Sequence, residues 1–99
     1  MNADVMRYIA EREEVLGVVR ALLIERLHVQ REPDEIDPDV PLFGSGLGLD
    51  SIDAVEFVLI LEERFGLRLT DDFMTRADLR TVNSVVDAVL ANRAASAGR

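Results

Sequence analysis

The stretch of sequence that decides the fold is residues 48–66, GLDSIDAVEFVLILEERFG. Asp50 is placed to cap a helix and Gly66 to stop it, so we expect a helix from Ser51 to about Phe65. At about 100° per residue, one face carries Asp53, Glu56, Ile60, Glu63 and Arg64, flanked by Ile52 and Leu59. The opposite face, which we assign to the core, carries Ala54, Phe57, Val58, Leu61 and Phe65. Acids with exposed apolar residues such as Leu59 and Ile60 between them are typical of a helix that binds a protein partner.

A longer amphipathic pattern precedes this helix. Apolar residues recur at helical spacing from Val5 to Leu27, which predicts a helix over about residues 4–28. Residues 29–50 lose this period and contain three prolines and three glycines, so we expect a long loop between the first and second helices. We expect the loop to be ordered and functional, because it holds apolar residues that can pin it to a helical core: Ile36, Val40, Leu42, Phe43, Leu47 and Leu49.

The remaining sequence predicts two further helices and no strand. A short helix is expected within residues 71–79, around Phe73 and Met74, and a last helix follows Thr81 as its N-cap. Residues 94–99 have no period and are expected to fray. The prediction is an all-α protein, a small bundle, in one domain that spans residues 1–99, with a core over about residues 5–92 and a frayed tail over 93–99.

Composition excludes several classes of function. The 99 residues carry a net charge of -8, which argues against a nucleic-acid binder. There is no cysteine and one histidine, His28, to which we assign no role, and all 11 basic residues are arginine. Residues 44–48 lack the lysine of a phosphate-binding loop, which argues against a nucleotide site. The acidic residues 34–39 lack the glycine and glutamate of a calcium loop, so we predict no metal site. With no apolar run that would span a membrane and no secretory signal, the expected location is cytoplasmic.

The negative charge is concentrated in the middle of the chain. Residues 32–72 contain twelve acidic residues and two arginines, Arg64 and Arg68, a formal charge of -10. Such a surface is either simply solvated or an electrostatic docking face for basic partners, which raises the rate of encounter.

Ser51 is the position where the sequence suggests chemistry. Its hydroxyl is expected at the tip of a loop and at the N-terminus of a helix, where backbone N–H groups and the helix dipole favour a phosphate group. No histidine lies nearby in sequence to act as a base, so we predict no catalytic residue. The alternatives are that Ser51 accepts a modification made by another enzyme, or that Asp50 and Ser51 are only an ordinary helix cap.

Two segments resemble the acyl carrier protein family. They are residues 42–56, LFGSGLGLDSIDAVE, and residues 61–69, LEERFGLRL. The resemblance implies a four-helix bundle of the acyl-carrier type, with a 4'-phosphopantetheine arm from coenzyme A attached to Ser51 through a phosphodiester. The thiol of the arm would carry acyl groups as thioesters, and the protein would not itself be an enzyme. Asp50 would assist docking of the phosphopantetheinyl transferase that attaches the arm.

The resemblance also implies partners and a pathway. It assigns the partner-facing side of the second helix to Ile52, Asp53, Val55, Glu56, Leu59 and Glu63. The implied partners are the transferase and acyl-loading, condensing and tailoring enzymes with basic docking patches, and the protein is expected to be a monomer. Arg64, Arg68 and the longer termini depart from the fatty-acid carriers and favour polyketide or other specialised acyl synthesis. Two alternatives stay open: a helical protein-interaction module and a carrier that is never modified.

Overall fold

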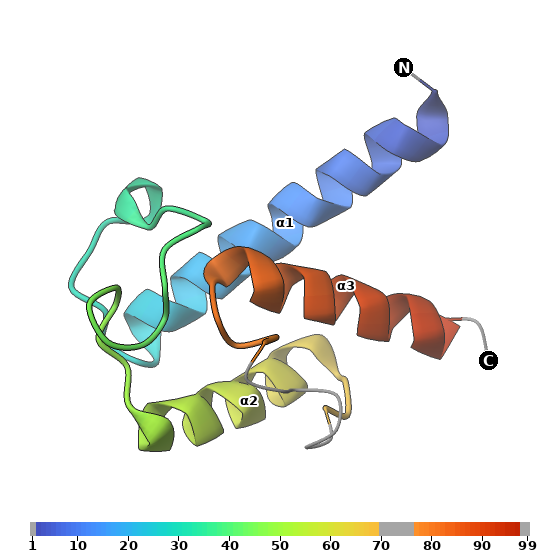
Figure 1. Ribbon diagram of the computed structural model, residues 1–99. Coiled ribbons are helices and arrows are strands. Elements are labelled where there is room, and N and C mark those ends of the chain that lie inside the picture. Colours follow the sequence, from blue (N-terminus) through green and yellow to red (C-terminus); the bar gives the residue numbers. More distant parts are fainter. Residues whose placement is uncertain (1, 70–76, 98–99) are drawn as a thin grey trace.

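The computed structural model describes residues 2–69 and 77–97, with the backbone alone for residues 95–97. This part of the chain is all-helical, as predicted. It contains the α-helices α1 (Ala3–Glu25), α2 (Ser51–Phe65) and α3 (Val82–Ala97), and the short 3-10 helix η1 (Pro33–Glu35) (Figure 1). The fourth helix, predicted around Phe73 and Met74, falls outside the described residues.

The first helix ends three residues earlier than predicted, and His28 makes the turn that follows. His28 has a φ of 60°, in the left-handed region that glycine normally occupies after a helix. The N–H of Val29 reaches back to the carbonyl of Leu23 at 3.0 Å, which satisfies one of the carbonyl groups left free at the helix end. His28 therefore has a structural role in the turn that follows α1. The sequence analysis did not predict this role.

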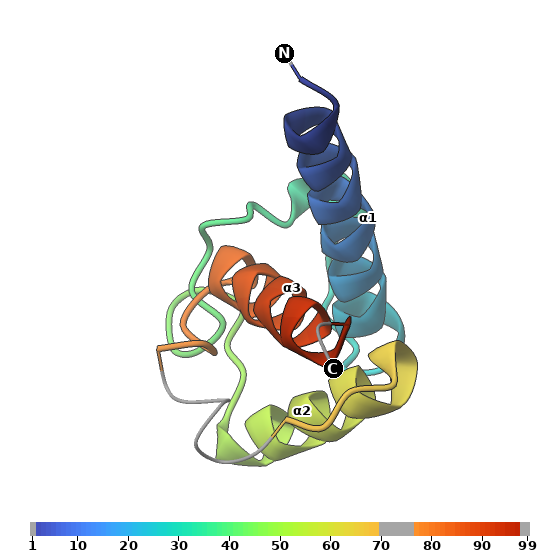
Figure 2. The same cartoon turned by 90° about the vertical axis from the view of Figure 1, so that its right-hand side faces the viewer.

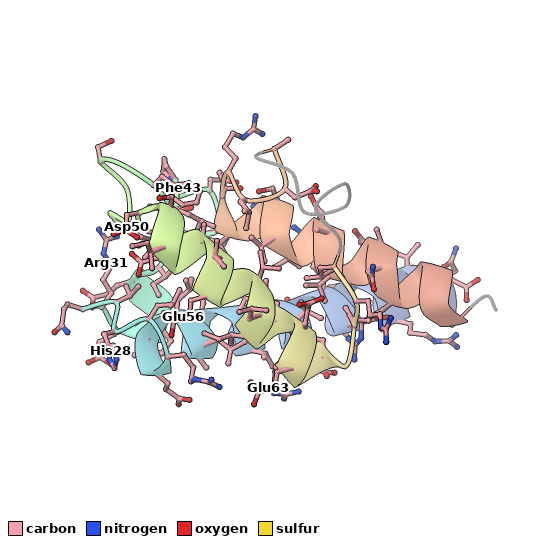
Figure 3. All side chains as sticks on the ribbon, turned by 90° about the horizontal axis from the view of Figure 1, so that it is seen from below. His28, Arg31, Phe43, Asp50, Glu56 and Glu63 are labelled. Carbon is pink, nitrogen blue, oxygen red and sulfur yellow. The ribbon has the colours of Figure 1, made fainter. Side chains whose placement is uncertain are left out.

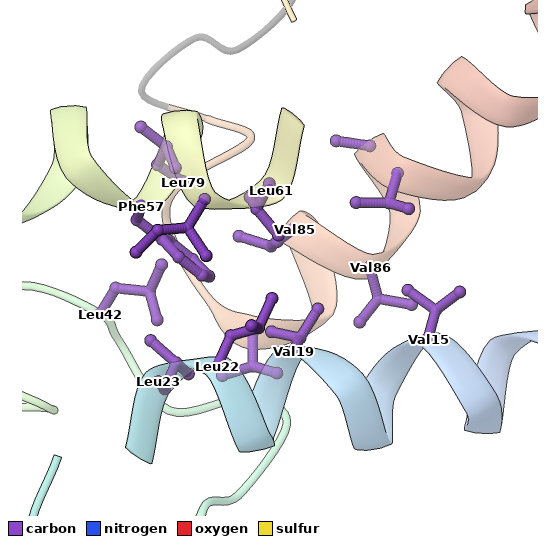
Figure 4. Packing of buried hydrophobic residues seen from close by; sticks show 14 of the residues in the cluster. Val15, Val19, Leu22, Leu23, Leu42, Phe57, Leu61, Leu79, Val85 and Val86 are labelled. Carbon is purple, nitrogen blue, oxygen red and sulfur yellow. The ribbon is translucent and has the colours of Figure 1, made fainter. Parts of the chain in front are cut away.

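The core lies where all three α-helices and the long loop meet (Figure 4). α1 contributes the fully buried side chains of Val15, Val19 and Leu23. Phe57 is the largest fully buried side chain, and α3 adds a row of valines. Burying apolar area of this kind is the main favourable term in folding. The fully buried apolar residues of α2 and α3 are Phe57, Leu61, Val82, Val85, Val86 and Val89.

The start of α1 does not join this core. It projects away from α2 and α3 in two perpendicular views (Figures 1 and 2). Val5, Tyr8 and Ile9, which continue the apolar pattern of α1 in the sequence, are exposed there, and the first fully buried residue is Val15. The apolar stripe is therefore longer than the part of it that the other helices cover.

The loop between α1 and α2 is anchored to the core, as its apolar residues predicted. Ile36, Leu42 and Leu49 are buried, while Val40, Phe43 and Leu47 are partly buried against the same core. Backbone hydrogen bonds fix its path: the Leu42 N–H donates to the Arg80 carbonyl at 3.0 Å, and the Leu49 N–H donates to the Leu42 carbonyl at 2.9 Å. The residues before Ser51 are thus held by burial and by hydrogen bonds.

α3 begins at the predicted cap and runs further than expected. The Ser84 N–H donates to Thr81 Oγ1 at 3.1 Å, which confirms Thr81 as the N-cap. The helix continues to Ala97, whereas fraying was expected from residue 94. Its last residues are mainly alanine, which has the highest intrinsic helix propensity.

Replacing glycine by alanine should change the stability of the protein in opposite directions at Gly46 and at Gly17. An ideal Cβ on Gly46 would overlap the Pro41 carbonyl oxygen, which accepts the Leu47 N–H, whereas nothing lies within 4 Å of a Cβ on Gly17 in the middle of α1. We expect Gly46→Ala to lower the free energy of unfolding by about 1–3 kcal/mol. Gly17→Ala should raise it by about 1 kcal/mol, because alanine favours the helix.

Urea unfolding followed by circular dichroism measures both changes. Each variant is the matched control of the other, since both replace glycine by alanine. A Gly46→Ala variant with the urea midpoint of the parent would contradict the close approach of Gly46 to Pro41.

Candidate functional site

A reciprocal pair of hydrogen bonds closes the start of α2. The Asp53 N–H donates to Asp50 Oδ1 at 2.8 Å, and the Asp50 N–H donates to Asp53 Oδ2 at 3.0 Å. Asp50 has the extended backbone of an N-cap, with φ -108° and ψ -177°. This capping box satisfies the third N–H group of the helix without using the side chain of Ser51.

Ser51 is therefore free at the exposed tip of α2. Its side chain is exposed, and its hydroxyl has no hydrogen-bond partner among the residues that the structure describes. The N–H groups of Ser51 and Ile52 are the first two of the helix and have no partner within it. A phosphate attached to the hydroxyl would meet the positive end of the helix dipole and these N–H groups.

Beside Ser51, three apolar side chains lie exposed along α2. Ile52 is 76% exposed, Val55 64% and Leu59 60%, and with Ser51 and Glu56 they line a shallow hollow of ≈ 490 Å³. We call these three residues the docking stripe. Single exposed apolar side chains are ordinary, but three adjacent ones next to a free hydroxyl form a surface on which a partner protein can bind.

The prediction that Ile60 faces outward is wrong. Ile60 is 3% exposed and belongs to the core. The side of α2 that carries it turns towards the end of α1, where the C-cap residue Arg26 lies 3.7 Å from Glu63. The exposed face is therefore rotated from the predicted one and is centred on the docking stripe.

The acids of this face differ in what they contact. Glu56 is exposed and has no ion pair with any described residue, and it lies along the same edge of α2 as Glu63 (Figure 3). The Glu63 carboxylate has Arg26, the C-cap residue after α1, as a neighbour, and Asp53 is half-buried and used in the capping box. Glu56 is thus the acid most available to a basic partner, and Asp53 is the least available.

A groove opens on the other side of Ser51. Its volume is ≈ 730 Å³, and we call it the Ser51 groove. α2, the loop before it and the turn at residues 77–80 each supply part of its wall, and most of the lining side chains are apolar. The lining residues are Pro41, Phe43, Leu49, Asp50, Ser51, Ala54, Ala77, Leu79 and Arg80.

The sequence analysis did not find this groove. Three of its lining residues lie far from Ser51 in the sequence and belong to no recognisable motif: Ala77, Leu79 and Arg80. They reach the groove because Thr81 pairs with Pro41 in an isolated β-bridge, and the Leu42 N–H binds the Arg80 carbonyl. Only the tertiary path of the loop brings these residues together.

The described residues offer no metal centre. Across residues 2–69 and 77–97, no group of three or more histidine, aspartate or glutamate side chains is close enough to hold an ion. Over the same residues, no helix has both the length and the apolar character that crossing a bilayer requires.

Comparison with known proteins finds a matching family model, a similar sequence and a similar solved structure. Residues 17–89 match the family model described as the phosphopantetheine attachment site. The acyl carrier protein of Thermosynechococcus vestitus is 33% identical over 78 residues, which cover 79% of this chain and 90% of that protein. The solved structure of the acyl carrier protein from Enterococcus faecalis has a TM-score of 0.65 and 33% identity, and the match covers 82% of this chain and 96% of that one.

Proposed function

The chain belongs to the acyl carrier protein family, whose prosthetic group is 4'-phosphopantetheine, and from this premise we propose that Ser51 Oγ is the atom that bears the group. A phosphopantetheinyl transferase supplies it from coenzyme A. When bound, the group supplies a terminal thiol that holds acyl chains as thioesters. The protein is a carrier and has no catalytic residues of its own.

The free hydroxyl of Ser51 is the observation that carries this proposal. It is exposed, it has no partner in the described part of the chain, and it lies at a helix start that favours negative charge. A phosphodiester at this oxygen needs no rearrangement of the capping box, because Asp50 and Asp53 bind each other's backbone and not Ser51. The residues present therefore fit the group.

Asp50 serves both the helix and the transferase in this proposal. Its carboxylate caps α2 and is also exposed beside Ser51. An acid at this place attracts a basic transferase to the hydroxyl that it modifies. The same reasoning gives Glu56 and Glu63 a part in attracting loading, condensing and tailoring enzymes with basic patches.

The cargo belongs to fatty-acid, polyketide or related specialised acyl synthesis in the cytoplasm, carried by a monomer. The side chains of Arg64 and Arg68 are exposed and interrupt the acidic surface near the end of α2. A carrier with this mixed surface suits a dedicated set of partners, so we favour specialised synthesis over general fatty-acid synthesis.

The first prediction concerns the modified residue. Incubation with coenzyme A and a broad-specificity phosphopantetheinyl transferase should add one phosphopantetheinyl group to the parent protein and none to Ser51→Ala. Intact mass spectrometry measures the addition, and circular dichroism checks that both proteins are folded.

Ser45→Ala is the matched control, because Ser45 is an exposed serine in the loop before α2. It should be modified as the parent is. A folded parent that gains no mass would contradict the carrier function and favour an unmodified interaction module, and modification of Ser51→Ala would move the site elsewhere.

The second prediction separates charge from apolar contact on α2. Binding of the transferase to the unmodifiable Ser51→Ala protein is measured by a surface biosensor at low and high salt. Adding Glu56→Gln should lower the association rate about twofold at low salt and weaken its salt dependence. Adding Val55→Ala should instead raise the dissociation rate about threefold, because it removes contact area within the docking stripe.

Glu14→Gln provides the control for net charge. Glu14 is an exposed acid on α1, outside the docking stripe. If it slowed association as much as Glu56→Gln does, the partner would respond to total charge, and the assignment of the α2 face would be wrong.

A further inference from the structure

Arg80 stands apart from the other residues that line the Ser51 groove. Two lining residues are charged, Arg80 and Asp50, and the Asp50 carboxylate already accepts the Asp53 N–H. Among the described residues, Arg80 is the only cation of the groove. Arg80 is an exposed residue, and its guanidinium forms no ion pair or hydrogen bond with the described part of the chain.

The backbone of Arg80 is nonetheless held in place. Its N–H donates to the Ala77 carbonyl at 3.3 Å, and its carbonyl accepts the Leu42 N–H at 3.0 Å. Thr81, the next residue, forms the bridge to Pro41 and caps α3. A long cationic side chain thus starts from a fixed point on a largely apolar groove.

We propose that Arg80 selects acyl groups that bear a carboxylate. The proposal rests on the function proposed above, with the acyl group attached through Ser51. A plain hydrocarbon chain would gain contact with Phe43, Leu49 and Leu79 but nothing from a guanidinium. A chain that ends in a carboxylate would meet a complementary charge at Arg80, on a protein whose net charge of -8 otherwise repels it.

The phosphate beside Ser51 has its own binding groups, so it does not require Arg80. The N–H groups of Ser51 and Ile52 and the dipole of α2 lie at the attachment point itself. The free guanidinium is therefore assigned to the cargo and not to the phosphodiester.

The experiment compares two cargoes of equal length. The transferase loads the protein with hexanoyl or adipoyl coenzyme A, where adipoyl ends in a carboxylate and hexanoyl in a methyl group. The rate at which hydroxylamine cleaves each thioester is followed by intact mass, since a chain held in the groove protects its thioester. Arg80→Gln should speed cleavage of the adipoyl form about threefold, the scale of a single exposed ion pair, and leave the hexanoyl form unchanged.

Arg68→Gln is the matched control, because Arg68 is an exposed arginine that does not line the groove. It should change neither rate. Equal acceleration of both cargoes by Arg80→Gln would overturn the selectivity, and so would an effect that Arg68→Gln reproduces.

A second readout distinguishes cargo from phosphate. The NMR signal of the Arg80 Nε–H group should move when adipoyl replaces hexanoyl, and not when the arm is attached without cargo. A shift already complete in the cargo-free form would assign Arg80 to the phosphodiester and overturn the proposal. Failure to load Ser51 would refute the proposed function itself, whereas loading without any effect at Arg80 would refute this inference alone.

Discussion

The pair of hydrogen bonds between Asp50 and Asp53 is the constraint on which the functional site depends. A helix start must satisfy its first N–H groups, and serine is one of the residues that commonly do so. Here the two aspartates supply the cap, with donor–acceptor distances of 2.8 and 3.0 Å. Ser51 is released from that task and keeps an exposed hydroxyl beside unpaired N–H groups. The cap thus leaves the hydroxyl free at this position, as the proposed attachment of the prosthetic group requires.

A second requirement is that this helix start stays in a fixed place. Leu42 and Leu49 bury the loop that leads to it, and the turn before α3 is bound to the same loop through the Arg80 carbonyl. As a result, Ser51 lies between two different surfaces. In the proposed function, the docking stripe of α2 binds partner proteins and the Ser51 groove receives the acyl group that the arm carries. A carrier needs both, because it must present a cargo to one enzyme and protect it on the way to the next.

Local signals in the sequence were enough for both ends of α2, for the start of α3 and for the exposed position of Ser51. The caps at Asp50 and Thr81 and the stop at Gly66 depend on neighbouring residues alone, and the structure has each of them. Ile60 could not be placed in this way, because its burial depends on where α1 crosses α2. The place of Arg80 in the groove likewise follows from the tertiary contact between two distant segments. Periodicity divides a helix into faces, but the neighbouring elements decide which face is covered.

The central claim is that Asp50 caps α2 so that Ser51 does not have to. The most direct measurement is the free energy of unfolding of Asp50→Ala and Ser51→Ala, each from urea titration of the unmodified protein. The account predicts a loss of about 1 kcal/mol for Asp50→Ala and a change within about 0.5 kcal/mol for Ser51→Ala. A loss for Ser51→Ala as large as that for Asp50→Ala would contradict the account, because the hydroxyl would then be part of the cap.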